Sequence, residues 1–368
     1  MLLSNMWYVG AWSNEIKDQA LFERTIAGVS LVMFRQKDNE IAVINNMCPH
    51  RFAPLSMGKL VGDTVECRYH GLRFDASGQC VHNPHGQGNI PAKACVDSYP
   101  AVERHDMIWI WMGDPTLADP DQIPDFSCHT SAQFPTVCGV IEMEANYELI
   151  TDNLMDLSHV EYVHEGILGS DAIKCGEHEV IQSGTTVYSN RWCPDGLAPP
   201  AWDAMFGHYG KSVDHWLYIR WDAPAHMLLD VGITPTGTPR NNGIWMYGTN
   251  ILTPKDDNST HYFWAVSRSY RIDDPAAGAE WEGAIKAAFV GQDKPMIEGQ
   301  ARMMNGRTVN ELEPVLLTTD SASVRCRRIV TQLQESSEAA KPAHNLLSTL
   351  LHEHDDKAEQ MKKIVPVV

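Results

Sequence analysis

The sequence lacks any apolar run of the ~18 residues that a membrane-spanning helix requires. It also shows no secretory leader, because the opening MLLSNMWYVGAW has no basic start and Ser4 and Asn5 interrupt its apolar residues. We therefore expect a soluble cytoplasmic protein with no membrane partner.

The sequence has fewer basic residues than acidic ones. It contains 29 lysines and arginines against 47 aspartates and glutamates, which gives a formal net charge of −18. A protein that binds nucleic acid normally presents a basic surface, so we expect no nucleic-acid partner. An acidic surface favours solubility and steers basic protein partners.

The sequence also lacks a glycine-rich dinucleotide fingerprint at a strand–helix junction. The segments GHYG and GTPRNNG come nearest and do not fit that pattern. We therefore expect no site for a nicotinamide cofactor on this chain.

The sequence also lacks the cysteine pattern of a disulfide framework. The nine cysteines are odd in number and scattered, which in a cytoplasmic protein is not typical of disulfide pairing. We expect most of them to be small buried apolar residues. Only Cys48 and Cys67 have histidines at ligand-like spacing.

Short apolar runs and turn clusters predict an α+β protein: an N-terminal all-β domain, then a larger domain with an antiparallel sheet flanked by helices. The predicted domains are 1–115, 116–335 and a C-terminal extension of unknown role, 336–368. Gly113–Phe126, with three prolines and four aspartates, indicates a linker. The remaining elements are expected as helix within 144–164, strands within 178–193, 215–234 and 243–270, helix at about 278–304 and 320–335, and an amphipathic stretch at Leu346–His352.

The first candidate site is the segment CPHRFAPLSMGKLVGDTVECRYHGLRF, which holds Cys48, His50, Cys67 and His70. Three interpretations fit two such Cys/His pairs: coincidence, a structural zinc site, or a Rieske centre. Zinc fingers usually place two cysteines in the first pair and two histidines in the second, whereas here each pair is mixed. In a Rieske centre two thiolates hold one iron and two histidines the other, and the mixed order favours this interpretation.

The second candidate site is the segment ANYELITDNLMDLSHVEYVHEG, with His159 and His164 five residues apart. On an ideal helix this spacing separates the two side chains by about 140°. They could be two partly exposed histidines, or a π-bulge or helix end could bring them together as two ligands of a two-histidine, one-carboxylate iron site. Downstream, Asp293 continues the apolar stripe of Ile285 and Phe289 by i, i+4 spacing, and a core-facing carboxylate needs a partner such as a metal.

The predicted stripe continues to Met296 and Ile297, while Glu282 and Glu298 lie off it and are expected to be solvated. Pro295 is expected to kink or start a helix.

The motifs resemble those of the Rieske non-haem iron oxygenases over roughly residues 5–335. NMWYVGAW, CPHRFAPLS, YHGLRFDASGQC and VERHDMIWIWMGDP are similar to the branch with vanillate and dicamba O-demethylases and toluenesulfonate methyl-monooxygenase. The resemblance implies a [2Fe–2S] cluster, a mononuclear Fe(II) whose third ligand is Asp293, and a homotrimer. It also implies that Asp156 bridges subunits from His70 to an iron-site histidine, with Asn153 as a nearby supporting amide.

The function implied is that of a terminal monooxygenase on a small aromatic substrate, foremost O-demethylation of a methoxylated aromatic acid. The reaction would use O2 and electrons from NADH, delivered by a separate reductase or ferredoxin. The alternatives are a ring or methyl hydroxylase of the same family and, from another class, a non-catalytic Rieske electron carrier. The residues identify neither the substrate nor the reductase.

The other histidines, His215 among them, have no paired spacing and are expected at the surface or as satisfied core residues. Most tryptophans of the strand-rich half should be core, with one or two lining a pocket. Asn250, His226 and Arg220 are candidates for orienting a substrate carboxylate or phenol.

Overall fold

The computed structural model describes residues 3–339, and its contacts divide them into two compact units. Unit 1 runs to Asp125 and includes Thr253–Asp257; unit 2 takes the other described residues. The α+β class predicted from the sequence is confirmed. The predicted domain limits after residues 115 and 335 stay predictions.

Unit 1 is built from short antiparallel strands, as expected for the first 112 residues. Its three sheets are β1 (Met6–Trp12), β10 (Met107–Met112) and β9 (Ala101–Arg104); β2 (Phe22–Ile26), β3 (Val29–Arg35) and β4 (Ile41–Asn45); and β5 (Lys59–Val61), β6 (Thr64–Glu66), β7 (Arg73–Phe74) and β8 (Cys80–His82).

The middle sheet of unit 1 has a core on each face. Successive side chains of a strand point to opposite faces. On β3, Val32 and Phe34 pack in the core that also holds Cys48 and Cys67, whereas Leu31 and Met33 pack in the core against β1 and β10. The two cysteines are therefore rooted in a packed interior.

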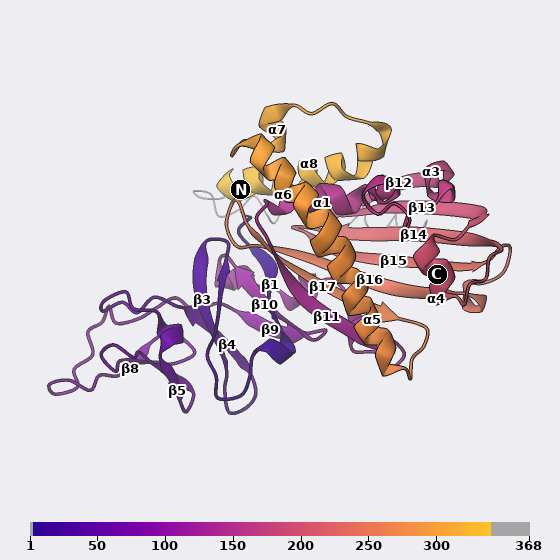
Figure 1. Cartoon of the computed structure of the whole chain (residues 1–368). Coiled ribbons are helices and arrows are strands. Elements are labelled where there is room, and N and C mark those ends of the chain that lie inside the picture. The colour runs from indigo at the N-terminus through magenta and orange to yellow at the C-terminus, as the bar shows by residue number, and fades with distance from the viewer. Residues whose placement is uncertain (1–2, 340–368) are drawn as a thin grey trace. The chain divides into compact units, whose positions relative to one another are not determined.

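Unit 2 is built on one seven-stranded antiparallel sheet (Figure 1). Its strand order is β11 (Thr136–Met143), β17 (Thr260–Arg268), β16 (Ile244–Pro254), β15 (His226–Pro235), β14 (Ser212–Asp222), β13 (Thr186–Leu197) and β12 (Glu177–Ser183). Each of the three predicted strand segments contains two strands of this sheet. Strand β11 was not predicted, because this half-buried edge strand has a weak alternation that Gly139 interrupts.

The helices of unit 2 cover the sheet, and a continuous helical rod crosses one face (Figure 1). The rod comprises α5 (Pro275–Ile285), a π-helix (Lys286–Asp293) and α6 (Lys294–Met304). The other helices are α1 (Tyr147–Met155), α2 (Val160–Val163), α3 (Asp171–Cys175), α4 (Pro200–Met205), α7 (Val309–Leu312) and α8 (Ser321–Ala339). The 3-10 turns are Ser13–Glu15, Leu55–Met57, Pro115–Leu117, Pro120–Gln122, Ser127–His129, Leu157–His159, Arg240–Asn242 and Thr318–Asp320.

The π-helix changes the phase of the predicted apolar stripe. Ile285, Asp293 and Ile297 are buried as expected, but Met296 is 56% exposed, so its assignment to the stripe was wrong. Glu298, expected to be solvated, is largely buried in an ion pair with Lys294 at 2.8 Å. Five residues are needed for each hydrogen-bonded turn of a π-helix, which rotates the residues that follow it.

Two further predictions concern helix ends. Pro295 is the second residue of α6 and directly follows the π-helix, in keeping with the expectation that it would kink or start a helix. Helix α8 extends the predicted 320–335 run to Ala339. The predicted amphipathic stretch Leu346–His352 lies outside the described residues. No described helix combines the length and apolar character needed to cross a bilayer.

The turn at Gly78 provides a test of the packing of unit 1. Gly78 has φ +79°, and a Cβ there would lie 2.0 Å from the carbonyl oxygen of Val96. We expect Gly78→Ala to lower the free energy of unfolding of unit 1 by about 2–5 kcal/mol, from backbone strain plus overpacking. Gly86 has φ +59° with no heavy atom within 4 Å of a built Cβ, so Gly86→Ala should cost only about 1–2 kcal/mol. Urea unfolding followed by tryptophan fluorescence measures both, and equal losses would contradict the packing argument.

Candidate metal centres

The loops of unit 1 that carry Cys48 and Cys67 share one backbone pattern. The amide of Cys48 donates to the carbonyl of Ala53, and the amide of Phe52 donates to the carbonyl of Cys48; Cys67 makes the same two bonds with Leu72 and Gly71. The residue four after each cysteine has a left-handed backbone, φ 59° at Phe52 and 72° at Gly71. Two similar turns therefore present two similar cysteines.

The four candidate ligands of these loops pair up by type. The thiols of Cys48 and Cys67 are buried and close enough to interact. The rings of His50 and His70 have their centroids 4.5 Å apart, and the Nδ1 of His70 is buried without a hydrogen-bonding partner among the described residues.

Electrostatics at Cys48 favour a bound metal. Burial, with the neighbouring Cys67 thiol, raises the pKa of Cys48 to about 11, while backbone N–H groups of His50 and Arg51 act against this. A bound metal would be needed to hold both sulfurs as thiolates. Two sulfurs inside and two imidazoles toward the surface match the donor set of a Rieske cluster.

In unit 2, the chain leaves the helical path between α1 and α2. Asp156 has φ −114° and ψ 88°, and its carboxylate accepts a hydrogen bond of 3.0 Å from the amide of Ser158. His159 precedes the single-turn helix α2 and His164 directly follows it. The helix ends, rather than a π-bulge, thus relieve the 140° separation that an ideal helix imposes.

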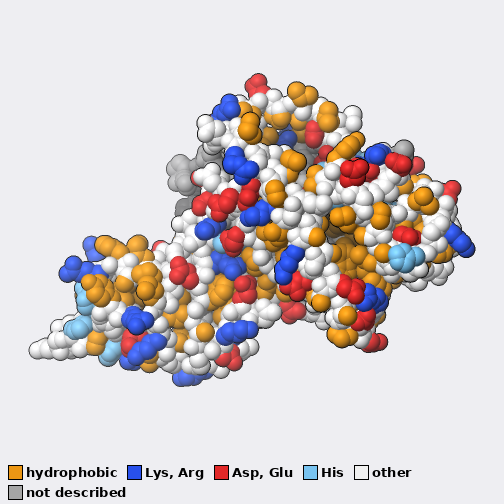
Figure 2. Space-filling view, in the orientation of Figure 1, with side chains coloured by type: hydrophobic (Ala, Val, Ile, Leu, Met, Phe, Trp, Pro, Cys, Tyr) orange, Lys and Arg blue, Asp and Glu red, His pale blue; other side chains and the backbone are white. Residues whose placement is uncertain are grey.

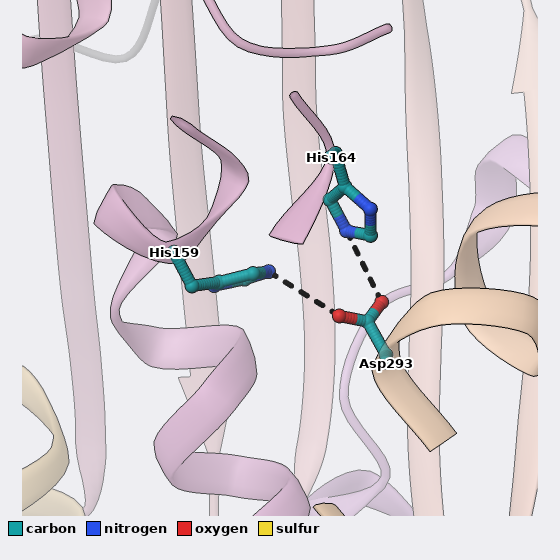
Figure 3. Close-up of side chains that lie close together, drawn as sticks. All are labelled: His159, His164 and Asp293. Atoms are coloured by element: carbon teal, nitrogen blue, oxygen red, sulfur yellow. Dashed lines mark ion pairs between the residues drawn. The ribbon is translucent and has the colours of Figure 1, made fainter. Parts of the chain in front are cut away.

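His159, His164 and Asp293 meet in a buried group (Figure 3). The Nε2 of His159 lies 3.7 Å from Oδ1 of Asp293, and the Nε2 of His164 lies 3.3 Å from Oδ2. The candidate ligand atoms of the three residues all lie within 4.8 Å of one another. The π-helix ends at Asp293 and delivers the carboxylate to the two histidines.

The hydrogen bonds of the two rings fix which nitrogen faces the carboxylate. The Nδ1 of His159 donates to the carbonyl oxygen of Asp156 at 2.7 Å, and the Nδ1 of His164 lies 2.7 Å from Oε1 of Gln292. Since a carbonyl oxygen only accepts, each neutral ring turns an Nε2 lone pair toward Asp293. Lone pairs facing a carboxylate repel unless a cation lies between them, so the group fits the two-histidine, one-carboxylate site of non-haem iron.

The surroundings shift the pKa values of the two histidines in opposite directions. Burial lowers the pKa of His159. Burial acts in the same direction on His164, but Asp293 and Gln292 outweigh it and raise the pKa of His164. The Oδ1 of Asp293 is buried with no hydrogen bond in the described structure, as expected of an atom that would bind a metal.

A cavity of about 170 Å³ adjoins the three residues. Its floor is the face of the sheet that carries Leu217 and Ile219 of β14 and Leu229 of β15, and the rod of α5 and the π-helix forms another wall. An apolar cavity of ~150 Å³ binds benzene, so this one has room for a single aromatic ring with small substituents.

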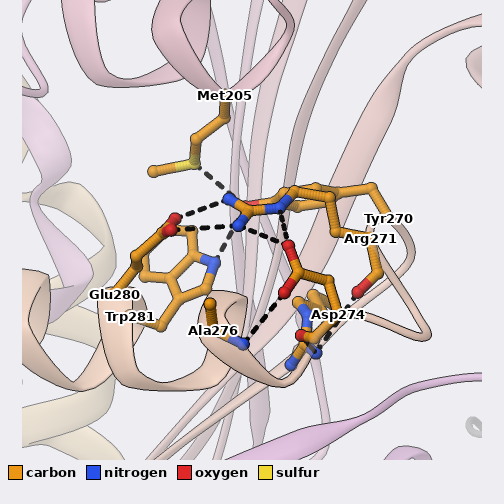
Figure 4. A network of polar contacts seen from close by, with 8 residues as sticks. Met205, Tyr270, Arg271, Asp274, Ala276, Glu280 and Trp281 are labelled. Carbon is orange, nitrogen blue, oxygen red and sulfur yellow. Dashed lines mark hydrogen bonds and ion pairs between the residues drawn. The ribbon is translucent and has the colours of Figure 1, made fainter.

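A polar network holds the wall of the cavity that is remote from Asp293 (Figure 4). Asp274 caps α5 by accepting from the amide of Ala276 at 2.9 Å, and Arg271 pairs with both Asp274 and Glu280. The indole of Trp281 donates to the hydroxyl of Tyr270 at 2.8 Å, and that hydroxyl contacts Met205 of α4. Trp281 and Met205 both line the cavity.

Comparisons with known proteins identify the family. Residues 6–100 match the Rieske [2Fe-2S] domain, and residues 143–336 match the vanillate O-demethylase oxygenase C-terminal domain. The chain belongs to the Rieske non-haem iron oxygenases. It is 41% identical over 339 residues to the dicamba O-demethylase oxygenase component of Stenotrophomonas maltophilia, covering 91% of this chain and 98% of that protein.

Two further relatives place the Rieske oxygenase chain in the same branch. It is 38% identical to the chloroacetanilide N-alkylformylase oxygenase component of Rhizorhabdus wittichii, with 89% of this chain and 94% of that protein covered. The crystal structure of dicamba monooxygenase bound to 3,6-dichlorosalicylic acid superposes with a TM-score of 0.88 at 40% identity, covering 92% of this chain and 99% of that one. The resemblance to the O-demethylase branch is thereby confirmed, and the electron-carrier alternative is wrong because the chain belongs to a family of oxygenase components.

The cofactors of this Rieske oxygenase are a [2Fe–2S] cluster and a mononuclear iron. Cys48, His50, Cys67 and His70 would hold the cluster, and His159, His164 and Asp293 the iron. That assignment of residues remains our prediction, and the buried nitrogen of His70 and the buried oxygen of Asp293 are consistent with it.

The other predicted site residues lie outside the group formed by His159, His164 and Asp293. Asp156 contacts His159 through its backbone carbonyl, while its half-buried carboxylate caps the following turn. Asn153 lies half-buried on α1 and does not line the cavity. Of the three candidates for orienting the substrate, only Asn250 lines the cavity; Arg220 pairs with Asp222 at 2.7 Å, and His226 is buried elsewhere in the sheet.

Two residues that contribute to the site were not selected from the sequence. Gln292 holds His164, and only its position next to Asp293 could have suggested this. His215 is buried in the cavity wall, contrary to the expectation of a surface or satisfied core histidine. Its signal is a polar residue in the alternation with Leu217 and Ile219 on β14.

The role of Asp293 is tested by the iron content of the purified protein. We expect Asp293→Ala to contain one iron fewer per chain and to lose turnover while its cluster absorption stays unchanged, because the two centres share no ligand. Glu298→Ala is the matched control, since Glu298 lies on the next turn of the rod and pairs with Lys294. Metal analysis and visible spectra measure both variants. Full iron content in Asp293→Ala, or its loss in Glu298→Ala, would contradict the assignment.

Proposed function

We propose that this chain is the terminal oxygenase of a monooxygenase system that O-demethylates a small methoxylated aromatic substrate. Electrons would come from NADH through a separate reductase or ferredoxin. The single observation that carries the proposal is the ring-sized apolar cavity that opens on His159, His164 and Asp293. Hydroxylation of a ring or a methyl group is the alternative reaction of the same site. A cytoplasmic location stays a prediction from the sequence.

When bound, the [2Fe–2S] cluster and the mononuclear iron would supply the redox chemistry, which is single-electron transfer and activation of O2. One oxygen atom enters a C–H bond of the methoxy group, and two electrons and two protons reduce the other to water. The hemiacetal formed then breaks into a phenol and formaldehyde.

The contribution of the protein is position and exclusion of water. Three protein ligands would leave coordination positions open at the iron. Apolar walls hold the ring so that its methoxy carbon faces the three ligands, and a dry site protects the reactive step from side reactions.

Product analysis tests the reaction class. We expect the reconstituted system, with a methoxybenzoate, methoxybenzamide and aryl sulfonate panel, to release formaldehyde and a phenol in equal amounts with at least one methoxylated compound. Mass spectrometry identifies the phenol, and a colorimetric assay measures formaldehyde. Methyl analogues without the ether oxygen are the control. Products that are only ring-hydroxylated would favour the alternative reaction.

We also propose that the protein is a homotrimer in which the cluster of one subunit faces the iron site of the next. Such a ring is a closed heterologous interface. Large apolar side chains are exposed on and around the two cluster loops, among them Phe52 at 71%, Tyr69 at 64% and Met47 at 53%. Phe52 also keeps a left-handed backbone there, which a bulky residue adopts only under constraint. An exposed apolar patch of this kind is typical of an interface.

Asp156 is the residue proposed to connect the two centres across that interface. Its carboxylate accepts one bond, from the amide of Ser158, and its contact with His159 is made by the backbone. A side-chain substitution therefore leaves the orientation of His159 intact and removes only the carboxylate.

We expect Asp156→Asn to remain a trimer with both metal centres and to transfer electrons at least ~10-fold more slowly, because the amide loses the charge and an acceptor. Single-turnover reoxidation of the reduced cluster, with substrate and O2, measures the rate, and light scattering measures the assembly. Asp171→Asn, at a fully exposed acid on α3, is the control. A monomeric active protein, or reoxidation of Asp156→Asn at the wild-type rate, would refute this arrangement.

A further inference from the structure

The substrate cavity of unit 2 contains few polar groups. Figure 2 shows hydrophobic side chains gathered in a hollow of unit 2 over the middle strands, beside α5. Apart from the three candidate iron ligands, only His215 and Asn250 among the described lining residues carry a polar side-chain group outside an indole. These two groups are the available means of recognising a polar substituent.

His215 is poised to bind a ligand. Its side chain is 2% exposed, and neither ring nitrogen has a hydrogen-bonding partner among the described residues. On β14 it shares a face with Leu217 and Ile219, which also line the cavity. Leaving a buried polar group unpaired is costly, so a residue kept in this state is expected to gain its partner from a bound molecule.

The ring of His215 is uncharged. Burial lowers its pKa to about 3, so at neutral pH it offers one N–H donor and one nitrogen acceptor. Its ring lies 6.2 Å from that of Trp202, which in turn lies 6.4 Å from Trp281. The aromatic surroundings hold the imidazole in place without giving it a polar partner.

Asn250, unlike His215, already has a hydrogen-bonding partner. Its Oδ1 accepts a hydrogen bond of 2.6 Å from the hydroxyl of Tyr262, and its Nδ2 makes only a long contact of 3.5 Å with the carbonyl of Gly248. Asn250 therefore presents mainly an N–H donor.

The two polar groups lie toward opposite ends of the cavity floor. On β15, His215 pairs with Ile233 and Asn250 with Met227, six residues apart. The Asn250 end adjoins the iron site, since Tyr262 stacks on Phe289 of the π-helix at 5.7 Å. The His215 end adjoins Trp281, which precedes Asp293 by twelve residues along the rod.

No lysine or arginine lines this cavity within the part of the chain that the structure describes. A carboxylate or sulfonate bound away from the iron would be removed from water without a cation to pair with. A neutral imidazole and an amide N–H give an anion only uncharged hydrogen bonds, whereas a neutral amide or hydroxyl group satisfies the same donors at little desolvation cost.

We propose that the cavity selects an uncharged aromatic substrate and that His215 hydrogen-bonds a neutral polar group at the end of this substrate remote from the oxidised carbon. The proposal rests on the proposed function, because it assigns the substrate class of the same site. It narrows the aromatic acid implied by the resemblance to neutral molecules of similar size.

Binding to the anaerobic holoenzyme tests the charge selection without turnover. The probes are two amide–acid pairs of different length, para-methoxybenzamide with para-methoxybenzoate and para-methoxycinnamide with para-methoxycinnamate, together with anisole, which has no second polar group. In titration calorimetry at neutral pH we expect the better-fitting amide to bind at least ~10-fold more tightly than its acid.

Variants of His215 test the residue. We expect His215→Leu to weaken binding of the better-fitting amide roughly 5- to 150-fold, the cost of an unmet hydrogen bond, while anisole binds as before. His215→Gln keeps a donor and an acceptor and should recover part of the affinity. The free His215→Leu protein should melt at the same or a higher temperature, because it replaces an unpaired polar group by an apolar one. The matched control is His226→Leu, a buried histidine of the adjacent strand outside the cavity lining, which should leave the amide–anisole ratio unchanged.

The proposal is overturned if the acids bind as tightly as the amides, if neither amide binds, or if His215→Leu weakens amide and anisole equally or not at all. Formaldehyde assays on the same probes separate this from failure of the proposed function. Tight, His215-dependent amide binding that yields only hydroxylated products would leave the substrate class standing and remove O-demethylation. If instead the acids bind more tightly and release formaldehyde, O-demethylation would stand and the neutral substrate class would be removed.

Discussion

Asp293 is buried against the Nε2 atoms of two histidines whose Nδ1 atoms are already engaged. A carboxylate facing two lone pairs is repulsive in a site of low dielectric, and a divalent cation turns that repulsion into coordination. The break at Asp156, the single-turn helix α2 and the π-helix before Asp293 all position these atoms. Irregular backbone in unit 2 is thus concentrated where the ligands must converge, as is common for π-helical segments at functional sites.

The two cysteine loops of unit 1 position their candidate ligands with the same turn, used twice. One turn pattern, used at Cys48 and again at Cys67, buries both sulfurs in the core below β3. The left-handed position that the turn demands is filled by glycine in one loop and by the exposed Phe52 in the other. The proposed interface would bury the exposed ring of Phe52 when the subunits assemble.

The cavity of unit 2 is lined by the sheet and by the helical rod. The sheet supplies an apolar floor through simple alternation on β14, β15 and β16, and the helical rod supplies both a wall and the carboxylate. Because the floor carries only two polar groups in the described lining, substrate preference depends on few residues.

The cofactor chemistry and the α+β class could both be predicted from the residues and their spacing. The mixed Cys/His pairs have a spacing that few other sites use, and ligands close in the chain remain close in space. Asp293 could be proposed as the third ligand because its i, i+4 spacing from Ile285 and Phe289 predicts a buried carboxylate, and it is buried beside the two histidines. The strand β11, the exposure of Met296 and the burial of His215 without a hydrogen-bonding partner among the described residues became evident only in the tertiary structure. These depend on which face of a strand or helix meets a neighbour distant in sequence, and a single chain pattern carries no record of that contact.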